Sequence, residues 1–231
     1  MTNRERPSPV AWLVRASQSL AALLRPSKPT RPQVLVVVEG PNDIEFLRRI
    51  SAMLHRDSAR LPDLADMERQ GRVVFAPTGG VDLSTGFRYA GLALPEFHLL
   101  DRDIPPVTQT RHQIAAMVNS RSRCRAAITS KRSLENYLHP AAIFEASGFS
   151  VAFSDDDDLP ELIARKANER HEPGVPWDDL SARARRRLRY RAKKWLNTRA
   201  VEQMTAARLA ERDLDGEVRA WLATIAKLGG R

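Results

Sequence analysis

The stretch Val34-Leu-Val-Val-Val-Glu-Gly-Pro-Asn-Asp43 contains the strongest fold signal in the chain. Its first five residues are all apolar and mostly β-branched, a pattern typical of a strand that is buried on both faces of a parallel sheet. Gly40 permits a close turn directly after this run, and Pro41 suits the first turn of a helix. We therefore predict a buried strand, a tight turn and a helix, with Glu39 and Asp43 at the junction.

Further strands and helices follow in alternation. Three short apolar runs predict strands at 72–76, 97–100 and 125–128, and helical spacing predicts helices at 41–54 and 108–119. Strands that alternate with helices indicate an α/β fold, here a doubly wound parallel sheet flanked by helices. Catalytic residues in such sheets gather beyond the carboxyl ends of the strands.

The chain divides into three parts by composition. For residues 1–32 the sequence predicts an amphipathic helix followed by a Pro-rich tether, and we expect this segment either to pack on its own domain or to dock on a partner. Residues 33–140 form the predicted α/β domain. Residues 141–231 form a helical C-terminal region, with helices predicted at 141–146, 159–170, 177–196, 198–212 and 214–228.

The net charge of +9 is unevenly distributed along the chain. Residues 1–32 contain six basic residues and one acid, and residues 181–231 contain 14 basic and five acidic residues. The middle, from 33 to 180, contains 17 basic and 22 acidic residues. A polyanionic partner would be attracted to the ends and would need cations to approach the acidic middle. A high arginine content across the whole proteome would produce part of the same excess.

Several protein classes are excluded by composition. A single cysteine, Cys124, excludes a disulfide framework and a Cys-rich zinc site. The apolar run near the start, Val10–Val14, is far shorter than the ~20 residues that span a bilayer, and no signal-peptide pattern follows it. We expect a soluble, cytoplasmic protein without membrane contact.

Four carboxylates fall where this fold would place a site. Glu39 follows the first predicted strand, and Asp43 lies in the first turn of the next helix. Asp101 and Asp103 follow the third strand, and if that segment is extended both side chains point to the same side. Hard divalent cations prefer such oxygen ligands. Singly, each acid is better explained as a helix cap, a turn residue or a solvent-exposed residue, but the combination predicts a metal site.

The segments Val36-Val-Val-Glu-Gly-Pro-Asn-Asp43 and Leu99-Leu-Asp-Arg-Asp103 resemble the TOPRIM domain of topoisomerases, bacterial primases and certain nucleases. A third segment, Ser130-Lys-Arg-Ser-Leu-Glu-Asn-Tyr-Leu138, is similar to OLD-family (overcoming lysogenization defect) nucleases. The resemblance covers roughly residues 33–140, with weaker likeness near 193–204. It implies a TOPRIM-type, Rossmann-like fold and an endonuclease that hydrolyses phosphodiester bonds with one or two Mg²⁺ or Mn²⁺ ions.

The resemblance also implies roles for individual residues. Glu39 would act near the scissile phosphate or bind metal, and the remaining ligands would be Asp43, Asp101, Asp103 and Glu135. Lys131, Lys193 or Lys194 would offset the charge of the transition state. Glu135 has a second interpretation, as an ordinary acid at a helix start.

Two features depart from the family pattern. Many TOPRIM proteins have a third acid where this chain has Pro105, and Glu135 is expected to replace it. The chain has no Gly-x-x-x-x-Gly-Lys-Ser/Thr motif, so an ATPase partner would be a separate protein. By family analogy, the chain would be the effector of a phage-defence or toxin system.

The segment Arg183–Lys194 carries eight cations in twelve residues, namely Arg183, Arg185, Arg186, Arg187, Arg189, Arg191, Lys193 and Lys194. A helix that is merely solvated usually includes acids as well, so we predict that this one binds nucleic-acid backbone, of DNA or RNA, without base specificity. The alternatives to a nuclease are a non-catalytic module that binds nucleic acid or an ATPase, and a primase- or topoisomerase-like TOPRIM enzyme.

Overall fold

The computed structural model describes residues 32–80, 82–171 and 174–230. The helix and tether predicted at 1–32 lie outside these residues, apart from Pro32. From residue 32 onward the chain forms one unit. No helix within the described ranges is long and apolar enough to cross a membrane.

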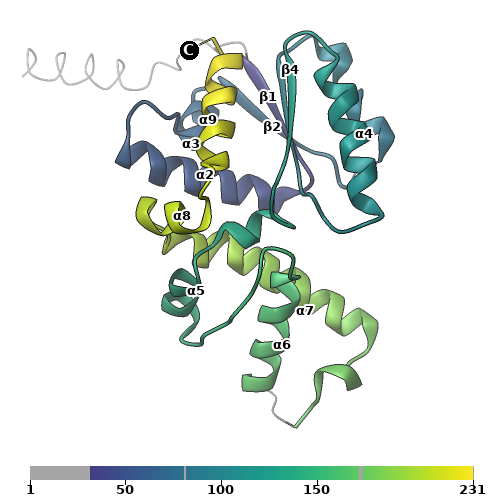
Figure 1. The fold of residues 1–231 in the computed structure, drawn as a ribbon, viewed down its shortest axis with the longest axis vertical. Coiled ribbons are helices and arrows are strands. Elements are labelled where there is room, and N and C mark those ends of the chain that lie inside the picture. Colours follow the sequence, from purple (N-terminus) through teal and green to yellow (C-terminus); the bar gives the residue numbers. More distant parts are fainter. Residues whose placement is uncertain (1–31, 81, 172–173, 231) are drawn as a thin grey trace, which may run out of the picture. The chain divides into compact units, whose positions relative to one another are not determined.

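Four parallel strands form one sheet in the order β2-β1-β3-β4 (Figure 1). They are β1 (Val34–Val38), β2 (Val73–Pro77), β3 (Glu96–Leu100) and β4 (Cys124–Ile128). β2 pairs with one edge of β1 and β3 pairs with the other. The direction in which the chain adds strands to the sheet therefore reverses at β1. The predicted α/β class, a parallel sheet flanked by helices, is confirmed, and the carboxyl ends of β1 and β3 flank the switch point at which such folds place their sites.

Strand β1 is buried on both faces, as its composition predicts. Val34, Val36 and Val38 pack into the main hydrophobic core on one side of the sheet. Leu35 and Val37 face the other side, where a smaller cluster forms. Successive side chains of a strand point to opposite faces, so an unbroken apolar run fits only a strand that is covered twice.

Helices cover the two faces of the sheet unequally. The main core contains side chains of α2 (Pro41–Asp57), α3 (Leu64–Arg69) and α9 (Glu217–Leu228). On the other face, α4 (Val107–Asn119) packs against β3 and β4. Figure 1 shows α9, the last helix of the chain, beside the first strand. The sheet is therefore closed on one face by elements from both ends of the described chain.

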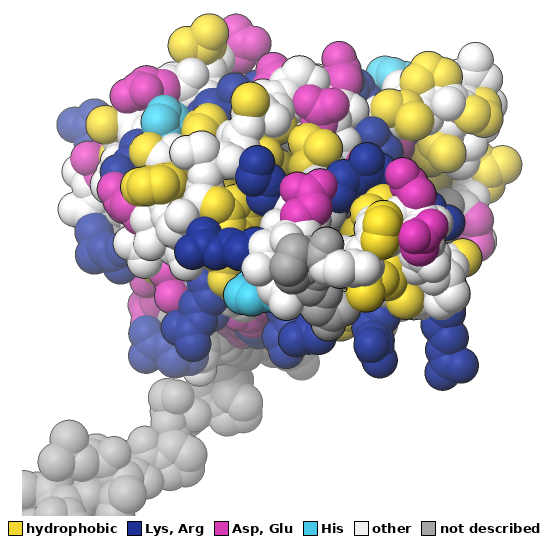
Figure 2. Space-filling view, turned by 90° about the horizontal axis from the view of Figure 1, so that it is seen from below, with side chains coloured by type: hydrophobic (Ala, Val, Ile, Leu, Met, Phe, Trp, Pro, Cys, Tyr) yellow, Lys and Arg dark blue, Asp and Glu magenta, His cyan; other side chains and the backbone are white. Residues whose placement is uncertain are grey.

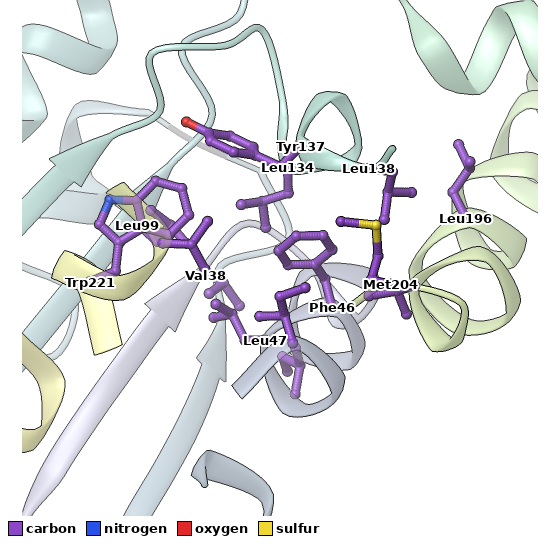
Figure 3. Close-up of a cluster of buried hydrophobic side chains, with 14 of the residues drawn as sticks. Val38, Phe46, Leu47, Leu99, Leu134, Tyr137, Leu138, Leu196, Met204 and Trp221 are labelled. Carbon is purple, nitrogen blue, oxygen red and sulfur yellow. The ribbon is translucent and has the colours of Figure 1, made fainter. Parts of the chain in front are cut away.

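The C-terminal helices share the main core with the sheet. They are α5 (Pro140–Ser147), α6 (Leu159–His171), α7 (Ala182–Trp195), α8 (Ala206–Arg212) and α9. A short 3₁₀ helix, η3 (Leu134–Tyr137), connects the two parts. In Figure 3, side chains of α2, η3 and the C-terminal helices form one cluster, and Tyr137 meets Trp221 edge to face at 5.3 Å between ring centroids.

Two helices predicted as continuous are interrupted. Instead of one helix at 177–196, the chain forms the turn η4 (Trp177–Asp179) and then α7, because Ser181 caps α7 by accepting from the Ala184 N–H at 3.2 Å. Instead of one helix at 198–212, α7 runs into the π-helical turn η5 (Leu196–Ala200), and a new helix begins after Thr205. The Thr205 hydroxyl accepts from the Arg208 N–H at 3.2 Å. Local capping thus overrode helical periodicity in both places.

The closure of the sheet by α9 yields a stability prediction. Leu222 of α9 is fully buried in the main core, so Leu222→Ala should lower the free energy of unfolding by about 2–5 kcal/mol. Leu214, which is 88% exposed, provides the control, and Leu214→Ala should change stability by no more than about 0.5 kcal/mol. Urea denaturation followed by circular dichroism measures both, and equal effects would mean that α9 does not close the core.

Candidate metal centre

The site is built at the carboxyl ends of β1 and β3. These strands are hydrogen-bonded neighbours, so Glu39, directly after β1, and Asp101, directly after β3, emerge side by side. Asp43 joins them from the first turn of α2, where the Gly40 N–H donates to its Oδ2 at 2.8 Å. The backbone arrangement expected from the sequence is therefore present for these three carboxylates.

Three carboxylates surround the ammonium group of Lys193. Its Nζ lies 3.4 Å from Asp43 Oδ1, 3.7 Å from Asp101 Oδ2 and 3.5 Å from Glu135 Oε1. Asp43 comes from α2, Asp101 from the end of β3, Glu135 from η3 and Lys193 from α7. We call these four side chains the Lys193 cluster. The Lys193 cluster therefore combines a carboxylate at the edge of the sheet with a lysine from the C-terminal helices.

Backbone and side-chain donors hold the carboxylates of the Lys193 cluster in place. The Leu134 N–H donates to Asp101 Oδ1 at 3.1 Å. The Asn197 amide donates to Glu135 Oε1 and also to the Lys193 carbonyl, at 2.9 Å for the latter. Glu135 is fully buried, so its carboxylate belongs to this cluster rather than to solvent, although it also lies in the first turn of η3.

A second cation, Arg111 of α4, holds the other two predicted acids. Its Nη2 lies 2.9 Å from Glu39 Oε1 and 2.5 Å from Asp103 Oδ2. We call these three side chains the Arg111 group, and both sets together the carboxylate site. Asp103 has a φ of 56°, and its N–H donates to the Arg132 carbonyl at 2.9 Å. The segment after β3 is therefore not extended as expected, and Asp101 and Asp103 contact different cations.

Burial shifts the proton affinity of the site. Burial raises the pKa of Glu39 from its ordinary 4.5 to about 7 against the opposing charge of Arg111. Burial likewise raises the pKa of Asp43, and raises that of Asp101 well above its ordinary value, in both cases against the effect of Lys193. Burial alone would lower the pKa of Lys193, but the carboxylates, Glu135 first among them, raise it well above its ordinary value. Burial therefore favours the protonated forms of Glu39, Asp43 and Asp101, and the two cations oppose this only in part.

The donor set has the chemistry that a hard divalent cation requires. Glu135 Oε2 is buried without a hydrogen-bond partner, whereas Glu39 Oε1 and Asp43 Oδ1 form ion pairs with Arg111 and Lys193. Carboxylate oxygens are the ligands that Mg²⁺ and Mn²⁺ prefer. The carboxylates are, however, spaced around Lys193 and Arg111 rather than around a metal ion. Within the described residues, no three His, Cys, Asp or Glu side chains are grouped so that they could hold a metal in this arrangement. The oxygen chemistry fits a metal, and binding one would require the carboxylates to close around it.

The three predicted lysines occupy different surroundings. Lys193 lies within the carboxylate site, and its side chain is 26% exposed. Lys131 instead forms an ion pair with Asp155 at 2.6 Å, and its Nζ lies 5.4 Å from the centroid of the Tyr137 ring. Lys194, the neighbour of Lys193, is exposed. Of the three, the structure brings only Lys193 to the carboxylates.

Sequence reasoning missed two residues of the site. Arg111 lies inside a helix that was predicted only from its periodicity, and no spacing signal marks it. Asn197 follows Lys193 by four residues, which places both on one helical face, so this spacing could have revealed it once Lys193 was suspected.

The eight cations of the predicted nucleic-acid-binding helix differ in their ion pairs and in their exposure to solvent. Lys193 points into the carboxylate site, and Arg189 pairs with Asp158 at 2.7 Å. Arg185 is half-buried. The remaining five are exposed, namely Arg183, Arg186, Arg187, Arg191 and Lys194. In Figure 2, Lys and Arg side chains gather along the lower edge of the face seen from below.

Comparison with known proteins gives limited results. No family model matches the chain, and no curated protein matches it. Two solved structures of the C-terminal region of the OLD protein of Xanthomonas campestris pv. campestris, phased with platinum and with mercury, are similar to it at 13% identity and a TM-score of 0.48. The matches cover 86% of this chain and 94% and 96% of those chains. The family resemblance seen in the sequence stays a prediction.

The charge balance of the site predicts the effect of removing its central cation. Lys193→Met leaves the carboxylates of the Lys193 cluster without their counter-charge. At pH 8 we expect it to lower the free energy of unfolding by about 3 kcal/mol, the low end for breaking a buried ion pair, because a quarter of the lysine is exposed. Lys194→Met is the matched control and should have little effect. Urea denaturation measures both.

The loss should depend on pH in a defined direction. Carboxylates with raised pKa values in the folded state make folding less favourable as pH rises from their unfolded values near 4 through their folded values. Without Lys193 these pKa values rise further, so Lys193→Met should lose less stability at pH 5 than at pH 8. An equal loss at both pH values would show that the lysine acts through packing rather than charge.

Proposed function

We propose that the protein is a divalent-metal-dependent nuclease that hydrolyses nucleic-acid phosphodiester bonds. The observation that supports this most strongly is the convergence of five carboxyl groups on only two cations, Lys193 and Arg111, beside the carboxyl ends of β1 and β3. Three of these carboxyl groups are buried, and burying more acids than the neighbouring cations can pair with is costly, so a site that retains them is expected to serve a ligand. Mg²⁺ or Mn²⁺, one ion or two, is the ligand that this donor set fits.

The proposal assigns the ions to Glu39, Asp43, Asp101, Asp103 and Glu135. A bound divalent ion supplies an activated water and neutralises charge on the attacked phosphate. Among the protein groups, Glu39 has a pKa of about 7 and so can take up a proton at neutral pH. Lys193 is the partly exposed cation of the site, and its role is to offset negative charge on a bound phosphate. Arg111, almost wholly buried, positions Glu39 and Asp103.

The surroundings of the site agree with a polyanionic substrate. Helix α7 carries exposed arginines along its length and ends with Lys193 at the carboxylates. The acidic site alone would repel a polyanion, and the cations of α7 would offset this repulsion and hold the polyanion beside the site. As a setting, we propose the effector of a defence or toxin system under a separate ATPase partner, on the sequence resemblance alone.

A second candidate rests on the two protein cations. Lys193 and Arg111 already offset part of the carboxylate charge, and no metal-ready group of three ligands is present among the described residues. Both facts favour a non-catalytic module that binds nucleic acid or an ATPase. The two candidates differ in one measurable property, which is turnover in the presence of metal.

Cleavage with metal tests the proposal. Labelled DNA and RNA, single-stranded and duplex, would be incubated with the purified protein and Mg²⁺ or Mn²⁺, and products resolved on denaturing gels. Glu39→Gln and Asp101→Asn should each reduce cleavage at least ~100-fold, because each removes a charge needed to bind metal or accept a proton. Asp215→Asn, a change of an exposed acid outside the site, should cleave like wild type.

The same variants test metal binding without turnover. Mn²⁺ should raise the melting temperature of wild type and of Asp215→Asn, but not that of Asp101→Asn. Nucleic-acid binding without cleavage in any metal would support the non-catalytic module. Identical cleavage activity in all variants would show that the carboxylates have no role in the reaction.

A further inference from the structure

The cations of α7 have separate tasks, and most of them are not used by the carboxylate site. Arg189 is held by Asp158, and Lys193 by the carboxylates. No ion pair within the described residues occupies Arg183, Arg186 or Arg187, whose side chains are exposed. A dense set of unpaired arginines is costly in mutual repulsion unless an anionic partner binds it.

These arginines share one side of α7 with an aromatic residue. At 100° per residue, Arg183, Arg186, Arg187, Tyr190 and Lys194 fall on one stripe, which we call the Arg–Tyr stripe. The opposite side packs on the protein through Leu188, Ala192 and Trp195, which belong to or pack against the main core. Four members of the stripe line an open depression of about 690 Å³, together with Ser181 and Ala184.

Tyr190 is one of three aromatic residues in the described ranges that are at least half exposed, and of these three it alone lies on α7. Its side chain is 56% exposed, and its ring takes part in no aromatic pair or cation–π contact among the described residues. Tyr137, by contrast, is buried and packs on Trp221. An exposed ring flanked by unpaired arginines has the composition of a stacking platform for nucleic-acid bases.

We infer that the Arg–Tyr stripe binds an unpaired nucleic-acid strand, with one base stacked on Tyr190 and the flanking phosphates on Arg183, Arg186 and Arg187. The inference rests on the proposed function for its purpose, and it names the substrate class as single-stranded or locally unpaired nucleic acid. Arginine–phosphate contacts do not distinguish paired from unpaired strands. The aromatic ring does, because base faces are hidden within a duplex.

The position of the stripe connects it to the carboxylate site. Lys193 lies three residues after Tyr190 and ten after Arg183, which corresponds to about 4.5 Å and 15 Å along the helix axis. A strand lying along α7 would therefore reach the carboxylates within a few nucleotides. The stripe and the site thus form one continuous track, in which the helix that holds the strand also supplies Lys193.

Binding without turnover tests the inference separately from cleavage. Fluorescence anisotropy would be measured in EDTA with labelled unstructured DNA and RNA strands and with duplex DNA. Tyr190→Leu should weaken binding of single strands about 5- to 150-fold, the range expected for loss of one stacked base, and should change duplex binding by less than about twofold. Tyr190→Phe, which keeps the ring, should bind like wild type. Dependence on Tyr190 with either DNA or RNA supports the inference and identifies the preferred sugar.

Two controls isolate the stripe from general charge and aromaticity. Arg183→Gln with Arg187→Gln should reduce the slope of log affinity against log salt by about 1.4 for single strands, at ~0.7 per phosphate contact. The same change at two exposed arginines, Arg56→Gln in the last turn of α2 with Arg60→Gln in the turn that follows it, should leave the slope unchanged. Phe144→Leu, at a half-exposed aromatic of α5, should leave affinity unchanged.

Three results would overturn the inference: wild-type affinity for single strands in Tyr190→Leu, an equal loss for single strands and duplex, or no binding of any nucleic acid. The last would leave an acidic protein as the partner of the stripe. Cleavage by the wild type together with Tyr190-independent binding would reject this inference alone. Tyr190-dependent binding without cleavage in any metal would reject the nuclease and keep the strand-binding surface.

Discussion

One ammonium group links parts of the chain that are far apart in sequence. Lys193 of α7 is surrounded by carboxylates from α2, from the end of β3 and from η3. Without it these acids would repel one another in a buried space, so the position of α7 and the ionisation of the site depend on each other. Hydrophobic packing brings the C-terminal helices to the sheet, and this electrostatic contact determines which end of α7 faces the strand ends.

The π-helical turn η5 adds a second constraint at the same place. Such turns insert an extra residue into a helix and often occur at functional sites. Here the turn begins directly after α7, and within it Asn197 donates to both Glu135 and the Lys193 carbonyl. The amide therefore ties the acid to the backbone of the residue that neutralises it. The π-helical turn therefore places the amide that holds the buried Glu135.

The sequence allowed prediction of the sheet and of six of the seven side chains of the carboxylate site, although Glu135 and Lys193 were named from the family resemblance rather than from spacing. An unbroken apolar run is compatible only with a doubly covered strand, and strand ends in a parallel sheet converge, so the neighbourhood of Glu39, Asp43 and Asp101 follows from pattern alone. Arg111 could not be predicted, because a helical arginine has the same pattern whether it faces solvent or a buried acid. The pairing of Lys131 with Asp155 and the left-handed backbone of Asp103 depend on tertiary contacts that residue spacing does not encode.

The packing of α9 against β1 has a consequence for the order in which the molecule can assemble on the ribosome. One face of the first strand is only partly covered, by α2 and α3, until α9 has been synthesised. Asp43 stays without its ammonium group until α7 appears. At about 5–20 residues per second, the 150 positions between Asp43 and Lys193 correspond to roughly 8–30 s of translation. During that interval the nascent chain exposes apolar strand surface, which makes it a substrate for chaperones, and its acids have no Lys193 to meet.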